Sequence, residues 1–462
     1  MPAQAASAEA TTESLTPQAR RVLGLAFLTL FIDLIGFSII FPLFPAMLDY
    51  YRAHEAPDTV FAHFLNTLGH ISDLVGGTTH RASVVVLFGG ILGSLYSLLQ
   101  FACAPVFGSL SDRFGRRPII LVSLVGILVS YALWFFAGSF ALLVWSRVIG
   151  GIMSANISTV SAIVSDVTSQ RTRSRGMAVI GIAFGLGFTL GPALGGISSL
   201  LDLSAHFPAL AAYGVNPWST AAAVAFVLTL GNLAQAIFFL PETRPETRHS
   251  ERIERSMNPL RLFHVEDYPG VSRTNLAYFI FLTAFSGMEF SLTFLAKERF
   301  GYTERQNAML FLIIGLVLAG VQGGYVRRKA DSIGPRRMAI HGLFCIVPGL
   351  LSIGFAGQFQ LLPLLFVGIV LIAGGAAQST PCLTSLVSLY TPPEEQGRVM
   401  GVFRSLGALA RAIGPLIACV LYWRLGASAA YYIGAALLLV PIALTRQLPA
   451  PRSWAETAPS EA

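Results

Sequence analysis

Hydrophobic residues in this chain form long uninterrupted runs, and short polar segments separate them. About 20 consecutive apolar residues are enough to cross a bilayer as an α-helix. Twelve runs reach that length, and each is predicted to be a membrane-spanning helix. The predicted spans are residues 22–48, 84–107, 118–138, 140–165, 175–199, 218–240, 274–297, 306–326, 337–356, 360–388, 398–422 and 428–446.

A charged, proline-containing segment between the sixth and seventh runs divides the spans into two groups of six. We therefore predict an all-α polytopic membrane protein built from two six-helix bundles. Polar sequence at both ends of the chain predicts disorder there. The expected organisation is an N-terminal segment (1–20), a first bundle (21–240), a linker (241–273), a second bundle (274–448) and a tail (449–462).

Composition supports the membrane assignment. Hydrophobic residues make up 54% of the chain and charged residues only 12%, whereas soluble domains carry roughly 25% charged residues. The net charge of +7 comes from arginines in short loops between apolar runs, which favours contact with anionic lipid over nucleic acid. With the N-terminus inside, 22 of the 31 Lys and Arg lie inside and six outside, so both termini are predicted to be cytoplasmic.

A densely charged loop follows the second predicted span, at Gly108–Pro118, and a weaker copy begins at Asp331, 219 residues after Asp112. A second pair of matching motifs lies in helices five and eleven. There Arg175 precedes Pro192, and Arg398 precedes Pro415, by the same number of residues, at an offset of 223. Two nearly equal offsets indicate a duplicated six-helix unit. Repeated halves are typical of alternating-access transporters.

The first loop is predicted to hold contacts that form in one transport state and break in the other. We expect Gly108 to allow close helix approach, Asp112 to accept from free helix N-terminal amides and Arg113 to reach an acid such as Asp166. The remaining glycine, Gly115, completes the pattern, and Arg116 and Arg117 are expected at the lipid headgroups. The alternative is that the positive charges only determine topology, which would require neither Asp112 nor the glycines.

Five charged residues stand out in the interior of the predicted spans: Asp33, Arg147, Glu289, Arg404 and Arg411. Charge within hydrocarbon is costly and usually functional. Asp33 and Glu289 lie near mid-membrane, where poor solvation opposes the charged form and a nearby arginine would favour it, so we predict that both take part in proton coupling. The alternative is a fixed salt bridge, for instance between Asp33 and Arg147, that only orients helices.

The three arginines remain charged and cannot carry the proton. Arg411 is the preferred contact for a carboxylate substrate, which a guanidinium binds with two hydrogen bonds. Arg404 lies nearer the cytoplasm and is assigned to the inner gate. Arg147 faces either the cavity or a buried acid, and coupling to Asp33 is favoured.

Small and polar residues complete the candidate site. Gly187, Gly191, Pro192 and Gly195 in helix five are expected to form a hinge or seal between the halves, or simply to allow tight packing. Five polar residues either line a cavity or make interhelical hydrogen bonds: Gln100, Asn156, Asn232, Gln235 and Gln378. No cofactor is expected, and His63, His70 and His80 lack the spacing of a metal site.

Three of these motifs together resemble the major facilitator superfamily across nearly the full chain: the loop Gly108–Pro118, Arg147 in Arg-Val-Ile-Gly-Gly, and the glycine-rich run Gly185–Gly196. The resemblance implies that Arg147 is linked to proton coupling. The helix-five run and Asp33 resemble features of the drug:proton antiporter group, which implies that the chain is an antiporter of this kind. The second loop departs from the pattern, because Arg327 stands where its first glycine is expected.

Further runs are similar to tetracycline-transporter-like animal members of that group, which implies export of amphiphilic organic compounds, organic anions among them. These runs are Leu87–Gly90, Leu99–Phe101, Gly176–Gly181 and Arg404–Ala412.

The sequence therefore predicts a monomeric proton-coupled exporter rather than an enzyme, with a small organic substrate, protons and the bilayer as its partners. An uncoupled organic-anion uniporter or exchanger is one alternative, and a non-transporting scaffold or receptor is another. The motif Gly-x-x-x-x-Gly-Lys-Ser/Thr is absent from the sequence, which argues against direct use of ATP.

Overall fold

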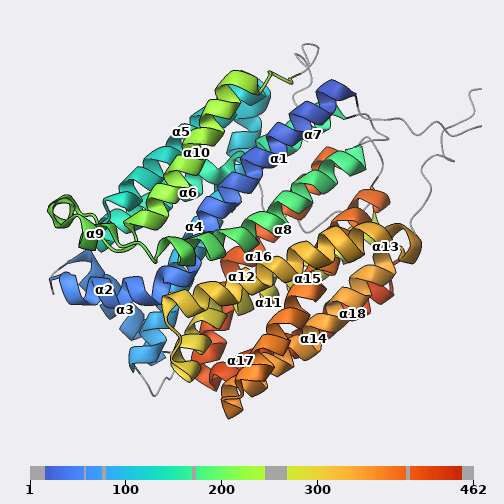
Figure 1. Cartoon of the computed structure of the whole chain (residues 1–462). Helices are drawn as coiled ribbons and strands as arrows, with labels where there is room; N and C mark the ends of the chain where they lie inside the picture. The colour runs from blue at the N-terminus through green and yellow to red at the C-terminus, as the bar shows by residue number, and fades with distance from the viewer. Residues whose placement is uncertain are drawn as a thin grey trace, which may run out of the picture.

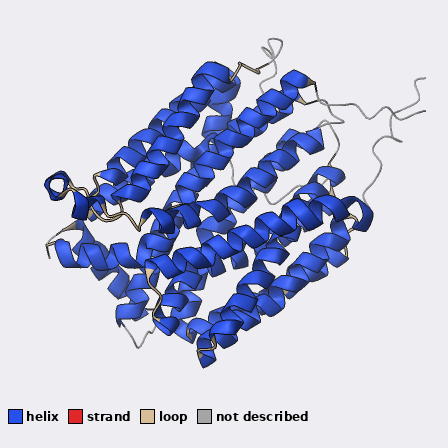
Figure 2. Cartoon of the chain, viewed as in Figure 1, coloured by secondary structure: helices blue, strands red, loops and turns tan. Residues whose placement is uncertain are grey.

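The computed structural model describes residues 16–56, 59–74, 80–168, 173–244, 268–391 and 396–449. These residues are almost entirely helical, and no strand occurs among them (Figure 2). Three of the predicted segments lie wholly or largely outside the described part of the chain: most of the N-terminal segment, most of the linker and nearly all of the tail.

The described residues of the first bundle form ten α-helices, several of them short. They are α1 (Pro17–Ser38), α2 (Phe44–His54), α3 (Val60–Leu74), α4 (His80–Phe114), α5 (Arg116–Phe135), α6 (Phe140–Met153), α7 (Ile157–Val167), α8 (Arg173–Ser198), α9 (Leu203–His206) and α10 (Ser219–Phe239). Three 3₁₀ turns connect them: η1 (Phe41–Leu43), η2 (Ser154–Asn156) and η3 (Pro208–Tyr213).

The second bundle contains eight α-helices and a π-helical segment. They are α11 (Pro269–Phe300), α12 (Glu304–Gly320), α13 (Arg327–Ile333), α14 (Pro335–Phe359), α15 (Leu362–Tyr390), α16 (Gln396–Leu425), α17 (Ala427–Leu437), α18 (Leu439–Arg446) and the π-helix η5 (Val321–Val326).

Eleven described helices are long and apolar enough to cross a membrane, and the bent α4 makes a twelfth. Its two parts, Phe88–Ala104 and Val106–Phe114, meet at 42°. Each of the twelve coincides with one predicted span apart from shifts at the ends. The prediction of a twelve-helix, multi-pass membrane protein is therefore confirmed.

Local sequence explains where several helices begin. The Thr16 hydroxyl accepts from the Ala19 amide at 3.1 Å, and Pro17 occupies the first turn of α1. Both features stabilise a helix N-terminus. At α12, Thr303 and Gln306 form a reciprocal capping box.

The two bundles meet along two pairs of helices. Helix α4 packs along α16, and α8 packs along α12 and also contacts α15. Figure 1 shows α8 between the groups, beside α12. Within the first bundle, α1 packs between α8 and α10. Helices α1 and α11 therefore lie behind the contact surface, where they can present polar groups to it.

The connection between the first two predicted spans is largely helical. Helices α2 and α3 occupy most of it. The Tyr51 hydroxyl donates to the Ala137 carbonyl at 2.7 Å, and Phe61 packs against Phe140. This segment is thus part of the folded bundle rather than a solvated loop.

Candidate functional site

Asp33 is buried in α1 and is hydrogen-bonded to Asn156 of η2. The Asn156 side-chain amide donates to Asp33 Oδ2 at 2.6 Å. The other carboxylate oxygen, Oδ1, is buried without a hydrogen-bond partner. Asp33 is 6% exposed and so faces protein rather than lipid. A buried acid with one free oxygen can accept a proton or a ligand donor there.

Arg147 of α6 lies among aromatic rings instead of pairing with Asp33. Its guanidinium carbon is 4.7 Å from the ring centroid of Trp134 and 5.9 Å from that of Tyr96. Both terminal nitrogens of Arg147 lack a hydrogen-bond partner. The alternative of a fixed salt bridge between Asp33 and Arg147 is therefore wrong for this structure. Cation–π contact with the rings replaces a carboxylate as the arginine's main interaction.

Two tyrosines connect Asp33 and Arg147 indirectly. Tyr96 and Tyr131 interact electrostatically with both groups. The Tyr131 hydroxyl is buried without a hydrogen-bond partner and lies against Gly36, one helical turn after Asp33. The acid and the arginine thus belong to one buried polar cluster without being in direct contact.

The second bundle holds a comparable cluster in α11 and α16. Glu289 is 8% exposed and interacts electrostatically with Arg411. Both terminal nitrogens of Arg404 are buried without a hydrogen-bond partner. The structure therefore places Glu289 and Arg411 close enough to interact, with Arg404 two helical turns before Arg411 on α16.

Both α16 arginines reach across to α8 of the first bundle. The Arg411 guanidinium lies 4.2 Å from the ring centroid of Phe188 and 4.9 Å from that of Phe184. Arg404 lies 5.0 Å from the same Phe184 ring. Phe184 and Phe188 were not singled out from the sequence, because phenylalanines at helical spacing look like ordinary core residues.

Aromatic contacts continue from this pair of rings to the first cluster. Phe188 packs against Phe37 at 5.4 Å between centroids, and Phe37 packs against Tyr96 at 4.5 Å. An aromatic path therefore runs from Arg411 to Arg147 through the centre of the molecule. Its ends are cationic and its middle is apolar, an arrangement suited to an amphiphilic anion.

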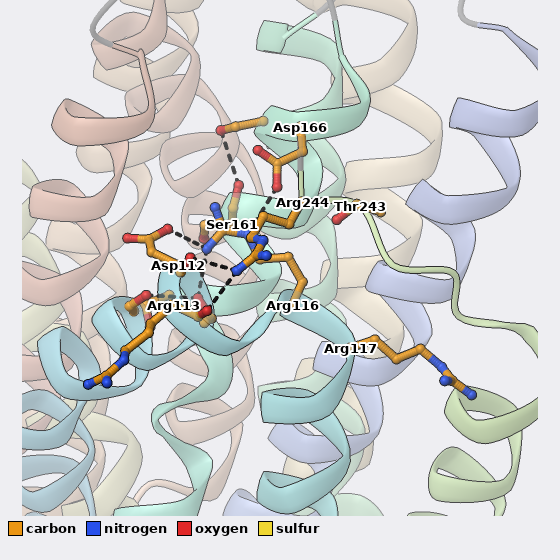
Figure 3. A network of polar contacts seen from close by, with 12 residues as sticks. Asp112, Arg113, Arg116, Arg117, Ser161, Asp166, Thr243 and Arg244 are labelled. Atoms are coloured by element: carbon orange, nitrogen blue, oxygen red, sulfur yellow. Dashed lines mark hydrogen bonds and ion pairs between the residues drawn. The ribbon is translucent and has the colours of Figure 1, made fainter. Parts of the chain in front are cut away.

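The charged loop forms a compact network (Figure 3) in which Arg116 is central. Its guanidinium donates to Asp112 at 2.5 Å and to Asp166 at 3.0 Å. The Arg116 side chain is 3% exposed. The prediction that Arg113 binds Asp166 is wrong, and so is the placement of Arg116 at the headgroups. The Arg113 guanidinium instead lies over the Phe114 ring at 5.2 Å.

The acid at the α5 N-terminus is Glu242 and not Asp112 as expected. Glu242 accepts from the backbone amides of Arg116 at 2.9 Å and Arg117 at 3.1 Å. Burial alone would raise the pKa of Glu242, but hydrogen bonds from four backbone amides outweigh it and lower that pKa. The sequence signal was an acid directly after the sixth span.

Gly115 is required at this point for two reasons. Its φ is +106°, in the region that favours glycine. A Cβ there would lie 2.6 Å from Glu242 Oε2. The Gly108 carbonyl accepts from the Ser111 hydroxyl at 2.8 Å, and its role in close helix approach stays a prediction.

The second copy of the loop keeps only part of this arrangement. Arg117 donates to the Ile237 carbonyl near the end of α10, and Arg336 donates likewise to the Thr445 carbonyl at the end of α18. The position of Arg116, however, is Pro335 in the copy. A proline side chain cannot form the buried ion pairs, so the loss of this arginine distinguishes the two loops more sharply than Arg327.

The helix-five glycines pack inside the first bundle and not between the halves. A Cβ on Gly187 would lie 2.6 Å from Leu34 Cβ, and Gly191 and Gly195 similarly approach α1. The predicted placement at the half–half interface is therefore wrong for these three. Helix α8 continues through Pro192 without a break in its helical assignment. The glycines facing the second bundle are Gly181, beside Arg404, and Gly185, beside Gln322.

The other polar candidates have mixed roles. Gln100 donates to the Ser154 carbonyl at 3.0 Å, and Asn232 donates to the Thr29 carbonyl at 3.3 Å, so both connect neighbouring elements. Gln378 donates to Gly374 within its own helix. The side-chain oxygen and nitrogen of the partly buried Gln235 are themselves buried without a hydrogen-bond partner.

Within the described residues no group of three metal-ligating side chains occurs. His63 lies in α3 and contacts the Thr59 carbonyl. The side chains of His70 and His80 lie outside the described part of the chain.

Comparison with known sequences places this architecture in a family. The model of the Major Facilitator Superfamily matches residues 26–415 and 328–461. The chain belongs to the major facilitator superfamily. Human major facilitator superfamily domain-containing protein 10 is 38% identical over 455 residues, covering 94% of each chain. The class C tetracycline resistance protein of Escherichia coli is 26% identical over 427 residues, covering 91% of this chain and 95% of the relative.

Solved structures agree with this major facilitator assignment. The crystal structure of the human organic anion transporter MFSD10 (TETRAN) has a TM-score of 0.76 and 38% identity, covering 93% of this chain and 100% of that one. A bacterial homologue of the lysosomal transporter Spinster, inward-facing and unoccupied, has a TM-score of 0.61 at 14% identity, which supports the fold alone. This chain is a membrane transporter and not an enzyme, as predicted.

Proposed function

We propose that this transporter exports amphiphilic organic solutes, organic anions among them, in exchange for protons. Two kinds of relative support the substrate class: one is described as an organic anion transporter and the others as tetracycline resistance proteins. The observation that carries the proposal is Arg404, whose two terminal nitrogens are buried without a hydrogen-bond partner beside an aromatic ring.

Arg404 and Arg411 bind the anionic group of the substrate. A guanidinium with free terminal nitrogens can hold a carboxylate through two parallel hydrogen bonds. The rings of Phe184 and Phe188 orient both guanidiniums and offer apolar surface to the rest of the solute. In the empty carrier Glu289 acts as the counter-ion of Arg411, and the substrate takes its place.

Asp33 carries the coupled proton. Its ionised form is stabilised by the Asn156 donor, and its free oxygen is available for protonation. Protonation removes a buried charge, which lets α1 repack against α8 while the empty carrier returns. Arg147, which interacts with the same two tyrosines as Asp33, sets the electrostatic environment in which Asp33 gains and loses the proton.

Proteoliposomes containing the purified full-length chain test the proposal. Labelled organic anion should move faster when an imposed pH gradient drives protons in the opposite direction. Asp33→Asn should abolish that acceleration and retain substrate-for-substrate exchange, whereas Arg411→Gln should weaken apparent affinity for anions. Wild-type transport that ignores the pH gradient would overturn proton coupling.

One observation favours an uncoupled organic-anion exchanger as the second candidate. The hydrogen bond from Asn156 to Asp33 is also what a permanently ionised, structural carboxylate would make. In that case Asp33→Asn would leave both exchange and net transport unchanged in rate.

A further inference from the structure

The end of the molecule far from the charged loop contains a separate cavity between the two bundles. Its volume is about 610 Å³. The first bundle contributes apolar and small residues, including Pro42 and Leu200, from the region of η1 and the end of α8. The second bundle contributes Lys297 and Arg305 together with Tyr302 and Asn307. One wall is therefore apolar and the opposite wall is cationic.

The cationic wall is held in place by local structure. Helix α11 ends at Gly301, whose φ is +66°, and the capping box of Thr303 and Gln306 begins α12 directly afterwards. This short connection places Lys297 on the last turn of α11 and Arg305 on the first turn of α12. The two cations thus approach the cavity from two fixed helices.

Asn307 adds a polar acceptor to the same wall. Its side chain is 2% exposed, and its amide nitrogen donates to the Thr293 carbonyl at 3.4 Å. That bond fixes the orientation of the amide, and Oδ1 is left buried without a hydrogen-bond partner. A buried acceptor without a donor is costly unless a ligand supplies one.

Lys297 also connects the bundles. Its ammonium lies 2.8 Å from Asp49 Oδ2 on α2, with side chains 43% and 52% exposed. An exposed ion pair of this kind contributes little stability. A carboxylate entering the cavity can therefore replace Asp49 as the partner of Lys297 and release this contact between the halves.

We infer that this cavity is a second anion-binding site, specific for an amphiphilic carboxylate that also carries a hydroxyl or amine donor. Lys297 and Arg305 bind the carboxylate, Asn307 Oδ1 accepts from the donor, and Tyr302 and Leu200 contact the apolar part. Binding there breaks the Lys297–Asp49 pair and favours opening at this end. The inference extends the proposed export function by assigning a site on the exit path, separate from Arg404 and Arg411.

Mandelate and phenylacetate are suitable probes, because they differ only by a hydroxyl. Binding to the full-length chain in nanodiscs is measured by equilibrium dialysis with labelled acid. Mandelate should bind more tightly than phenylacetate, and mandelamide, which is neutral, should not compete. Absence of saturable binding of both acids to the wild-type chain would overturn the site.

Charge-removing variants locate the bound acid. Lys297→Gln and Arg305→Gln should each weaken mandelate binding by about tenfold or more, as expected for loss of a charged hydrogen bond. Arg299→Gln is the matched control, since Arg299 lies on the same helix end but does not line the cavity. Equal affinity in all three variants would overturn the proposal, and Arg305 is exposed enough for its variant to fold.

Two further variants separate this site from the central one. Asp49→Asn frees Lys297 and should tighten mandelate binding by roughly twofold to fivefold, in line with a weak surface pair. Arg411→Gln should leave the Lys297-dependent component of mandelate binding unchanged while impairing transport. Binding lost in Arg411→Gln and kept in Lys297→Gln would refute the second site and leave the proposed export function standing.

Discussion

Asn156 donates a 2.6 Å hydrogen bond to Asp33 across 123 residues of sequence, joining the fourth span to the first. The bond holds a buried carboxylate in an apolar bundle without a cationic partner in direct contact. It therefore fixes the orientation of the Asp33 carboxylate, and Asn156 becomes a positioning residue for the acid.

Replacing Asn156 by leucine should destabilise the protein by about 1.5–3 kcal/mol, because a buried charged acceptor loses its donor. In the Asp33→Asn background the same replacement should cost less, since the carboxylate is already gone. A double-mutant cycle on thermal stability measures the difference. Additive effects of the two substitutions would show that the hydrogen bond does not couple them.

Arg116 and Asp166 form the most deeply buried ion pair of the charged loop, with side chains 3% and 4% exposed. Removing one partner of a buried pair typically costs about 3–5 kcal/mol. Arg116→Gln should therefore lower the thermal midpoint strongly. Arg113→Gln, which removes the neighbouring charge that contacts only a ring in this network, should change it little.

Equal losses in the two variants would mean that net charge, and not the geometry of Arg116, stabilises the loop. The variant Pro335→Arg extends the test to the second bundle by placing an arginine at the position that matches Arg116. It should not create a comparable network there.

Glu242 makes the stability of the protein depend on pH. Its pKa is lowered by four backbone donors despite partial burial, so its contribution to stability is present above the unfolded-state pKa and is lost as pH falls through the lower folded-state value. Wild-type protein should be more stable than Glu242→Gln at pH 7, and the difference should shrink towards pH 4. Thermal midpoints of both proteins across this range measure the effect.

A difference between these two proteins that does not change with pH would rule out the carboxylate charge as its cause. Asp202→Asn is a control for general acid effects, since Asp202 caps α9 on the opposite side of the bundle.

Sequence patterns predicted the twelve spans and the buried charges well, because apolar run length and charge in hydrocarbon are local properties. The partners of those charges depend on tertiary packing, and for these partners the predictions differ from the structure. Asp33 was matched to Arg147 because opposite charge was the only available criterion. In the structure the Asn156 amide contacts Asp33 and the rings of Tyr96 and Trp134 contact Arg147, and nothing local marks Trp134 or Phe188 as arginine contacts.

In the charged loop, too, the partners of the charged residues could not be predicted from the sequence. The motif was recognised from its residues, yet Arg113 and Arg116 could not be told apart, because the choice depends on which side chain points into the bundle. The glycines of helix five illustrate it again, since helical spacing places Gly187, Gly191 and Gly195 on one face without saying which neighbour that face meets.

Close packing of this glycine face against α1 predicts that a larger side chain there destabilises the protein. Gly195 approaches the Ile39 carbonyl so closely that an added Cβ would overlap backbone. Gly195→Ala should destabilise by about 1–3 kcal/mol through overpacking. Gly181→Ala is the control on the same helix, because its Cβ would meet Arg404 at an ordinary 3.7 Å. Similar thermal midpoints for the two variants would indicate that α1 and α8 can separate freely.

The stacking of Arg411 on Phe188 at 4.2 Å predicts that the ring positions the anion-binding guanidinium. A partly desolvated cation–π contact contributes about 1–2 kcal/mol, so Phe188→Leu should raise the apparent KM for an organic anion roughly fivefold to thirtyfold with a smaller change in maximal rate. Phe188→Tyr keeps the aromatic face and should restore the wild-type KM. Phe355→Leu removes a lipid-exposed stacked ring and should leave KM unchanged. A different result would contradict this role: Phe188→Leu lowers only the maximal rate, and Phe188→Tyr does not restore it. The ring would then contribute packing and not orientation of Arg411.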